Sequence, residues 1–231
     1  MTSNAQKKLI SIIMIDTIDL CGNTIYNGPL STAPSNDTPI FANSTLQNLA
    51  AMYLVDFENK LKAASSSGVP YIIVGGHFPV YSVAEHGSTQ CLVKNVMPLL
   101  HKYKVSAYLS GHDHNLQHIS YTNLGSTVEY IVTGANALNK NSQANAGTVP
   151  TNSLKFRWPT SSSLVQGAVD KISGGFLMIQ TSSTSMVVNF VVSRPKYFLG
   201  IPVPGTYTST IMYTKTIMPR VQNINFFFSL K

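Results

Sequence analysis

Short apolar runs and one long amphipathic stretch set the elements expected in the first third of the chain. Residues 9–15 form a continuous, β-branched apolar run, which is typical of a strand covered on both faces. Residues 20–43 are polar and predict a long loop. From Ser44 or Thr45, apolar residues recur at helical spacing as far as the Ser-Ser-Ser-Gly at 65–68, which predicts a helix with its stripe in the core. The stripe consists of Leu46, Leu49, Ala50, Tyr53, Phe57 and Leu61.

The alternation of strand and helix continues after this helix. Residues 69–74 predict a second strand, residues 88 or 89 to about 103 a second helix kinked at Pro98, and residues 105–109 a third strand. Strands that alternate with helices favour parallel pairing through right-handed crossovers, with the helices packed on the sheet.

The pattern then changes, because four further apolar runs are joined by turns rather than by helices. This predicts an antiparallel second part, so the expected fold class is α/β, or α+β. Residues 139–166 are loop-rich, and the tail beyond Arg194 has no pattern that predicts an element. The four runs are residues 116–121, 127–133, 175–180 and 186–192.

Composition indicates a globular protein, since 44% of the 231 residues are hydrophobic and only 11% are charged. The net charge of +7 comes from scattered residues, so no nucleic-acid partner is expected, although a positive field would attract a phosphorylated substrate. No run approaches the roughly 18 to 20 apolar residues of a membrane-spanning helix, so no membrane partner is expected. Lys7 and Lys8 precede an apolar run, but Asp16 and Asp19 interrupt it and no cleavage pattern follows, so no signal peptide is expected in this chain.

The cysteines and two glycosylation sequons bear on the compartment. Cys21 and Cys91 are the two cysteines, and on their own they could be buried thiols. Asn36 and Asn43 each begin an Asn-x-Thr sequence and are possible N-glycosylation sites in an exposed loop. Together these features favour an oxidising secretory compartment.

Candidate chemistry gathers where the predicted strands end. Gly111-His112-Asp113-His114 follows the third strand, and in extended backbone His112 and His114 would share a face while Asp113 points elsewhere. Such a pair suits one metal cluster, although histidines solvated in a turn are the alternative. His77 follows the second strand, and the carboxyl ends of neighbouring parallel strands converge on one edge, so His77 is also a candidate ligand.

Three further histidines have weaker claims. His86 lies nine residues after His77 and could be a third ligand, a general acid or a loop residue. His101 falls late in a helix and His118 within a strand, so both are expected to be structural or solvated.

Two long motifs carry a resemblance to a known family. Residues 76–87 (GHFPVYSVAEHG) and 111–117 (GHDHNLQ) resemble the C-terminal signatures of purple acid phosphatases of the small tartrate-resistant type. Residues 13–17 and 20–23 resemble the strand and loop that precede them, and the similarity runs from about residue 9 to 192. The resemblance implies the C-terminal part of an αββα metallophosphoesterase sandwich, which hydrolyses phosphate monoesters with one ferric ion and one divalent ion, iron or zinc.

The resemblance also assigns roles to individual residues. His77 and His112 match ligands of the divalent metal, and His114 matches a ligand of the ferric ion. His86 matches a catalytic histidine near the substrate that does not bind metal. Cys21 and Cys91 match positions where a disulfide occurs, and the family implies a secreted or lysosomal protein.

The sequence departs from the family in its missing N-terminal signatures. The forms GDxG, GDNFY and GNHD/E supply the aspartates, the tyrosinate and the asparagine, and they do not occur here. We therefore expect an incomplete metallophosphoesterase domain over residues 1–193 and a divergent tail over 194–231. The first hypothesis is an N-terminally truncated acid phosphatase, inactive as this chain. The alternatives are a degenerate, non-catalytic metal-binding or interaction protein, and a metallophosphoesterase that acts on diesters or nucleotides.

Overall fold

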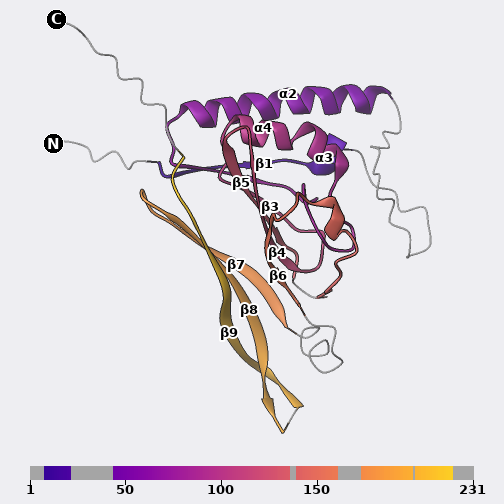
Figure 1. Ribbon diagram of the computed structural model, residues 1–231, viewed down its shortest axis with the longest axis vertical. Helices are drawn as coiled ribbons and strands as arrows, with labels where there is room; N and C mark the ends of the chain where they lie inside the picture. Colours follow the sequence, from indigo (N-terminus) through magenta and orange to yellow (C-terminus); the bar gives the residue numbers. More distant parts are fainter. Residues whose placement is uncertain (1–7, 22–43, 136–138, 161–172, 200, 221–231) are drawn as a thin grey trace, which may run out of the picture.

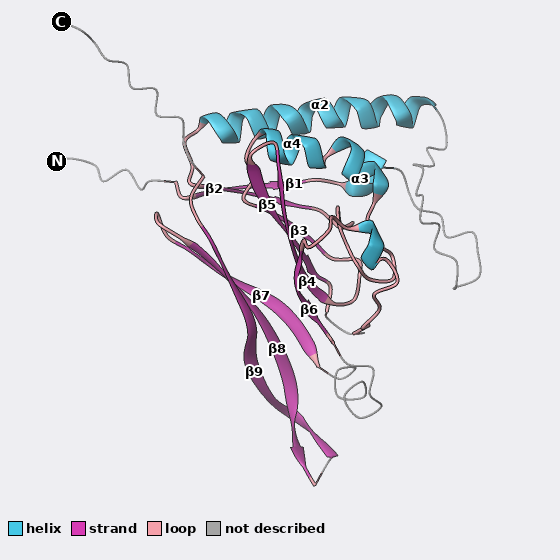
Figure 2. Ribbon diagram, viewed as in Figure 1, coloured by secondary structure: helices cyan, strands magenta, loops and turns pink. Residues whose placement is uncertain are grey.

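A computed structural model describes residues 8–21, 44–135, 139–160, 173–199 and 201–220. Three layers are visible in Figures 1 and 2: helices on one face of a six-stranded sheet, and a smaller three-stranded sheet on the other face. This mixed α/β architecture confirms the predicted fold class, with a parallel part followed by an antiparallel part.

The six-stranded sheet is parallel at one side and antiparallel at the other. Strand β1 pairs with β2, β2 with β3 and β3 with β5 in parallel, whereas β4 pairs antiparallel with both β5 and β6. The parallel crossovers predicted from the alternation are therefore confirmed. In spatial order the strands are β1 (Ile10–Met14), β2 (Tyr71–Gly75), β3 (Ala107–Ser110), β5 (Ser126–Thr133), β4 (Leu116–Asn123) and β6 (Leu154–Trp158).

The helices match the sequence pattern with one correction. Helix α2 (Ser44–Ser66) has the predicted bounds within two residues. The helix predicted to bend at Pro98 is two helices, α3 (Gln90–Asn95) and α4 (Met97–Lys102). Proline lacks an amide hydrogen and fits the first turn of a helix, so Pro98 lies in the first turn of α4 instead of bending one continuous helix. The short helix α1 (Thr17–Cys21) was not predicted, and a 3-10 turn spans Ala146–Thr148.

The three-stranded sheet consists of β7 (Gly174–Thr181), β8 (Met186–Phe198) and β9 (Ile201–Ile217), all antiparallel. Strand β8 continues past residue 193, where the domain was expected to end. Strand β9 lies in the tail, where the sequence predicts no element. Strand β6 falls in the stretch that was read as loop-rich. Most side chains of β9 are exposed, so the strand lacks the alternation that marks a half-buried strand.

Two apolar cores hold the layers together. One core packs α2, α3 and α4 on the sheet through residues such as Phe57, Leu61 and Leu92. The other packs Ile73 and its neighbours on the opposite face against β8. Among the described residues, no helix combines the length and the apolar character needed to cross a bilayer.

Two expectations about burial are wrong. Strand β1 is not covered on both faces, because Ile12 and Met14 are 61% and 69% exposed and only Ile13 of the central residues is buried. The strand lies at an edge of the sheet, with one face open. In α2 the apolar stripe is not buried throughout, since Leu46 and Leu49 are 42% and 53% exposed. The most deeply buried residues, Phe57 and Leu61, belong to the second half of the helix, whereas the exposed Leu46 and Leu49 lie near its start.

Candidate metal centre

Two loops at the carboxyl ends of β2 and β3 carry the candidate histidines side by side. The amide of Gly76 donates to the carbonyl of Leu109 at 3.0 Å, and the amide of Gly111 donates to the carbonyl of His77 at 3.1 Å. A Cβ at Gly76 would lie 2.7 Å from the hydroxyl of Tyr108, so the close approach requires glycine there. These contacts fix the residues directly before His77 and His112.

His77 and His112 face one another across these loops. His77 Nε2 lies 3.2 Å from His112 Nδ1, and the ring centroids are 5.0 Å apart. His112 has a φ of 65°, so the backbone is not extended and the alternation that was expected to place His112 and His114 on one face does not apply. A left-handed turn, rather than a strand, directs His112 toward His77.

His86 completes a cluster of three imidazoles. Its ring centroid lies 4.2 Å from that of His112. Its backbone amide donates to Asp113 Oδ1 at 3.0 Å, and Ser82 donates its hydroxyl to Asp113 Oδ2. Asp113 is 1% exposed, whereas His112 is partly buried and His114 is exposed. The role of its carboxylate in holding residues 82–86 was not predicted, because that loop is distant in sequence.

Gln117 extends the network that supports this loop. Its Oε1 accepts a hydrogen bond from the amide of Val83 at 2.9 Å. Its Nε2 donates to the hydroxyl of Ser82 and to Asn115 Oδ1, both at 2.8 Å. A buried amide and a buried carboxylate thus hold the His86 loop, while His77 and His86 are exposed and His112 is partly buried.

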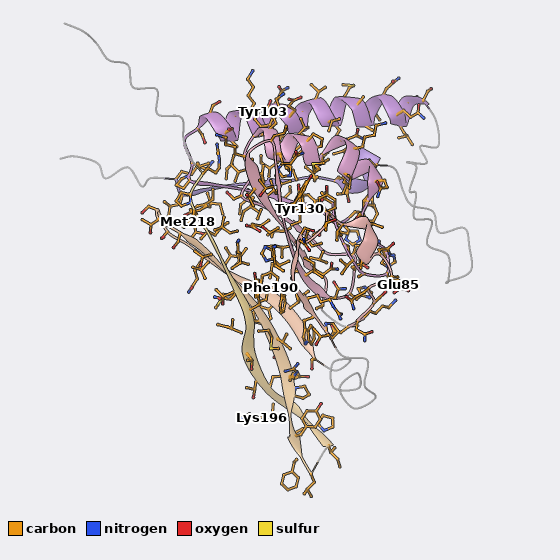
Figure 3. All side chains as sticks on the ribbon, viewed as in Figure 1. Glu85, Tyr103, Tyr130, Phe190, Lys196 and Met218 are labelled. Carbon is orange, nitrogen blue, oxygen red and sulfur yellow. A yellow bond between two sulfur atoms is a disulfide. The ribbon has the colours of Figure 1, made fainter. Side chains whose placement is uncertain are left out.

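Electrostatics keep the central imidazole neutral. Burial, together with the nearby imidazoles of His86, His77 and His114, lowers the pKa of His112 to about 3. A neutral imidazole retains the nitrogen lone pair that a metal ion binds. At the rim of the site, Glu85 pairs with Lys140, and the hydrogen bond from Lys140 lowers the pKa of the Glu85 carboxyl (Figure 3).

The two facing nitrogens fit a single divalent ion. With metal to nitrogen distances of about 2.0–2.1 Å, a separation of 3.2 Å between the nitrogens gives an angle at the metal of about 100°. That angle lies between octahedral and tetrahedral values. Within the described ranges, however, no three His, Cys, Asp or Glu side chains are grouped so that they could hold a metal ion. Asp113 is engaged with Ser82 and His86, and Asp16 caps α1 by accepting from the amides of Ile18 and Asp19. The described residues therefore do not complete a dinuclear centre.

A cavity of about 460 Å³ opens beside the histidine loops. It extends from the exposed face of β1 to Gly76 and Gly111, which directly precede His77 and His112. The exposed side chains of Ile12 and Met14 line its apolar part, and Ile179 of β7 lies at its other side. The open face of β1 and the candidate metal site are thus continuous.

His114 is exposed, and its carbonyl accepts a hydrogen bond from the amide of Lys140 at 2.8 Å. His101 and His118 are structural, as expected. His101 is buried, with Nδ1 bonded to the carbonyl of Ser126 and Nε2 to the hydroxyl of Tyr130. His118 is buried 2.6 Å from Glu129 and is not part of the cluster. Asn36 and Asn43, the two candidate glycosylation sites, lie outside the described residues.

The predicted disulfide between Cys21 and Cys91 is present, with a Cα to Cα distance of 5.7 Å. It joins the end of α1 to the start of α3 within the core.

Comparisons with known proteins show which families the chain is similar to. The calcineurin-like phosphoesterase family matches residues 17–116. Tartrate-resistant acid phosphatase type 5 of Homo sapiens is 36% identical over 195 residues, which cover 84% of this chain and 53% of the relative. Purple acid phosphatase 17 of Arabidopsis thaliana is 35% identical over 103 residues, which cover 45% of this chain and 29% of the relative.

A likeness among solved structures supports the fold alone. GAP50, the anchor in the inner membrane complex of Plasmodium, matches with a TM-score of 0.59 at 20% identity, covering 95% of this chain and 52% of that chain. This chain also spans about half the length of the tartrate-resistant enzymes it matches.

Fold, motifs and comparisons together define a class. Residues 17–116 of this chain match a calcineurin-like phosphoesterase domain. Within that class it is similar to the purple acid phosphatases, and specifically to the tartrate-resistant acid phosphatases of type 5, as the two histidine motifs indicated.

Proposed function

We propose that this chain supplies the histidine side of a dinuclear acid phosphatase centre that hydrolyses phosphate monoesters. In this proposal His77 and His112 bind the divalent ion, His114 binds the ferric ion, and His86 acts on the substrate. The observation that carries the proposal is the 3.2 Å approach of His77 Nε2 to His112 Nδ1 within motifs shared with the phosphatases. A disulfide supports an oxidising compartment, which fits a secreted or lysosomal protein.

The bound metals would polarise the phosphoryl oxygens and lower the pKa of a metal-bound water. The residues of this chain that lie near the metal site have separate roles. His112 presents a neutral imidazole, and Asp113 fixes the backbone of His86 so that its ring stays beside His112. From that place His86 can hold a proton for the leaving oxygen of an ester.

The isolated chain is proposed to be inactive. A ferric ion needs hard oxygen ligands; both oxygens of Asp113 accept hydrogen bonds, and the described residues contain no group of three potential ligands. The exposed apolar face of β1 next to the cavity indicates where additional strands could cover the sheet and bring carboxylates to the site. Without those ligands, His77 and His112 would hold one divalent ion weakly.

Elemental analysis and turnover of an aryl phosphate test this proposal. The purified chain should bind at most one metal ion and show only background hydrolysis. Robust acid phosphatase activity with two tightly bound metals would overturn the proposal of inactivity, and would mean that carboxylates of this chain complete the site.

The role of His86 is tested in a protein with a complete site. We propose a fusion of this chain to the segment of the human relative that precedes the matched region. In an active fusion, His86→Ala should lower kcat roughly 10 to 1,000-fold and leave the bound metal unchanged, because a residue that acts on the substrate does not retain metal. Loss of metal in this variant would make His86 a ligand instead.

One observation favours a second function. Because the described residues contain no group of three potential ligands, a non-catalytic metal-binding or interaction protein would also fit the structure. The fusion discriminates between the two, since a degenerate site would remain inactive when the missing ligands are supplied.

A further inference from the structure

The hairpin formed by β8 and β9 extends beyond the body of the protein. Strand β7 pairs with β8 only from Met186 to Ser193, whereas β8 and β9 remain paired as far as Phe198 and Ile201. The last five residues of β8 therefore form a two-stranded ribbon, which reaches roughly 17 Å past the three-stranded sheet at about 3.3 Å per residue. Figures 1 and 2 show this ribbon pointing away from the helices.

Large apolar side chains gather at the end of this ribbon. Leu199 is 87% exposed, Phe198 70% and Ile201 68%, and we refer to these three residues with Tyr197 and Tyr207 as the tip cluster. Tyr197 and Tyr207 are 40% and 59% exposed. Single exposed apolar residues are common on protein surfaces, but several large ones on one short ribbon indicate an interaction site.

The charge distribution points to the chemistry of the partner. All nine acidic residues of the chain lie at or before Asp170, whereas six of the 16 basic residues follow it. Lys215 is paired with Glu129, but Lys196 is exposed immediately beside the tip cluster (Figure 3). The ribbon thus combines exposed aromatic and aliphatic side chains with positive charge, and it contains no negative side chain.

We propose that the tip cluster inserts into the interfacial layer of an anionic phospholipid bilayer. Aromatic residues favour the headgroup region, aliphatic side chains gain by leaving water, and lysine is attracted to anionic headgroups. Each strand of the ribbon pairs on one side only, so its backbone stays in the hydrated headgroup layer and only side chains enter the bilayer. This contact is peripheral and requires no spanning helix. It departs from the expectation of no membrane partner and does not depend on the proposed phosphatase function.

Flotation with vesicles tests the proposal on the whole chain. Protein is mixed with phosphatidylcholine vesicles that contain about 30 mol% phosphatidylserine and centrifuged under a sucrose gradient, so that aggregates stay at the bottom and bound protein rises. The wild-type chain should float. The double substitution Phe198→Ser with Leu199→Ser should lower the partition coefficient at least tenfold. Lys196→Glu should lower it at least fivefold on these vesicles and little on pure phosphatidylcholine.

The chain offers a matched control for the apolar substitutions. Leu124 is 76% exposed, has a φ of 51° and precedes a glycine in the turn between β4 and β5, just as Leu199 has a φ of 49° and precedes a glycine. Leu124→Ser should therefore leave flotation unchanged. Both cysteines are in the disulfide, so Leu199→Cys and Leu124→Cys each accept one environment-sensitive dye. Only the dye at residue 199 should shift to the blue with anionic vesicles.

Three results would overturn the proposal. In the first, the wild-type chain does not float. In the second, the double variant floats as well as the wild-type chain does. In the third, Leu124→Ser lowers the partition coefficient as much as the tip substitutions do. The first result would leave a protein as the partner of the tip cluster.

Discussion

Replacing Asp113 by asparagine tests how the loop that carries His86 is held. The carboxylate is 1% exposed and accepts hydrogen bonds from the amide of His86 and the hydroxyl of Ser82. Ser82 Oγ in turn accepts from Gln117 Nε2 at 2.8 Å and from the amide of Ala84 at 3.1 Å. Both groups that face Asp113 therefore act as donors.

Asparagine has the shape of aspartate but presents one donor in place of an acceptor. If its oxygen faces His86, its NH₂ meets the hydroxyl of Ser82, which already accepts two hydrogen bonds. If the amide is flipped, the NH₂ meets the amide hydrogen of His86. In either orientation a buried donor lacks an acceptor, which costs about 2 kcal/mol of unfolding free energy.

Equilibrium unfolding in urea measures this loss. Asp113→Asn should lower the free energy of unfolding by about 2 kcal/mol with an unchanged m-value. Asp56→Asn is the matched control, because Asp56 forms an exposed i,i+4 pair with Lys60 and should change stability by less than about 0.5 kcal/mol. Equal stabilities of Asp113→Asn and the wild-type chain would refute the proposed role of the carboxylate.

Two further predictions concern groups distant from the histidines. Replacing Cys21 and Cys91 together by alanine should lower the unfolding free energy by up to about 4 kcal/mol, because the bridge closes a loop with a sequence separation of 70; two free thiols in protein from an oxidising host would contradict the bridge. Burial acts to raise the pKa of Glu129, but hydrogen bonds from His118 and Lys215 outweigh it and leave the pKa lowered. Because the pKa of Glu129 is lowered in the folded state, the carboxylate stabilises the fold at pH values above the ordinary carboxyl pKa. This stability is lost as the pH falls from there through the lowered pKa. Glu129→Gln should therefore flatten the acid side of a profile of stability against pH, and an unchanged acid side would count against the ion pair.

Periodicity predicted the parallel part of the fold well, because its strands and helices each bury a face. The run at 69–74 became β2, and the helix at 44–65 became α2. Strand β9 could not be found in this way, because most of its side chains are exposed and only its last residues, such as Tyr213 and Ile217, pack on the core. The exposed face of β1 was also missed, since an apolar run alone does not reveal which neighbours are present to cover it.

The candidate site was predictable in its residues but not in its geometry. His77, His86 and His112 were found from strand ends and motifs, and the structure brings them together. The approach of His77 to His112 depends on a left-handed residue, which the sequence pattern of alternating histidines does not show. The position of His86 depends on Asp113, which contacts it across 27 residues of sequence.

Titration of the purified chain with Zn²⁺ tests the central claim most directly, because it asks whether His77 and His112 share one metal ion. The account predicts a single site per chain, with affinity lowered at least tenfold in His77→Ala and in His112→Ala. His101→Gln, which changes a buried histidine outside the cluster, should retain the same affinity in the fraction that folds. Zn²⁺ binding that is unaffected by both alanine substitutions would contradict the account.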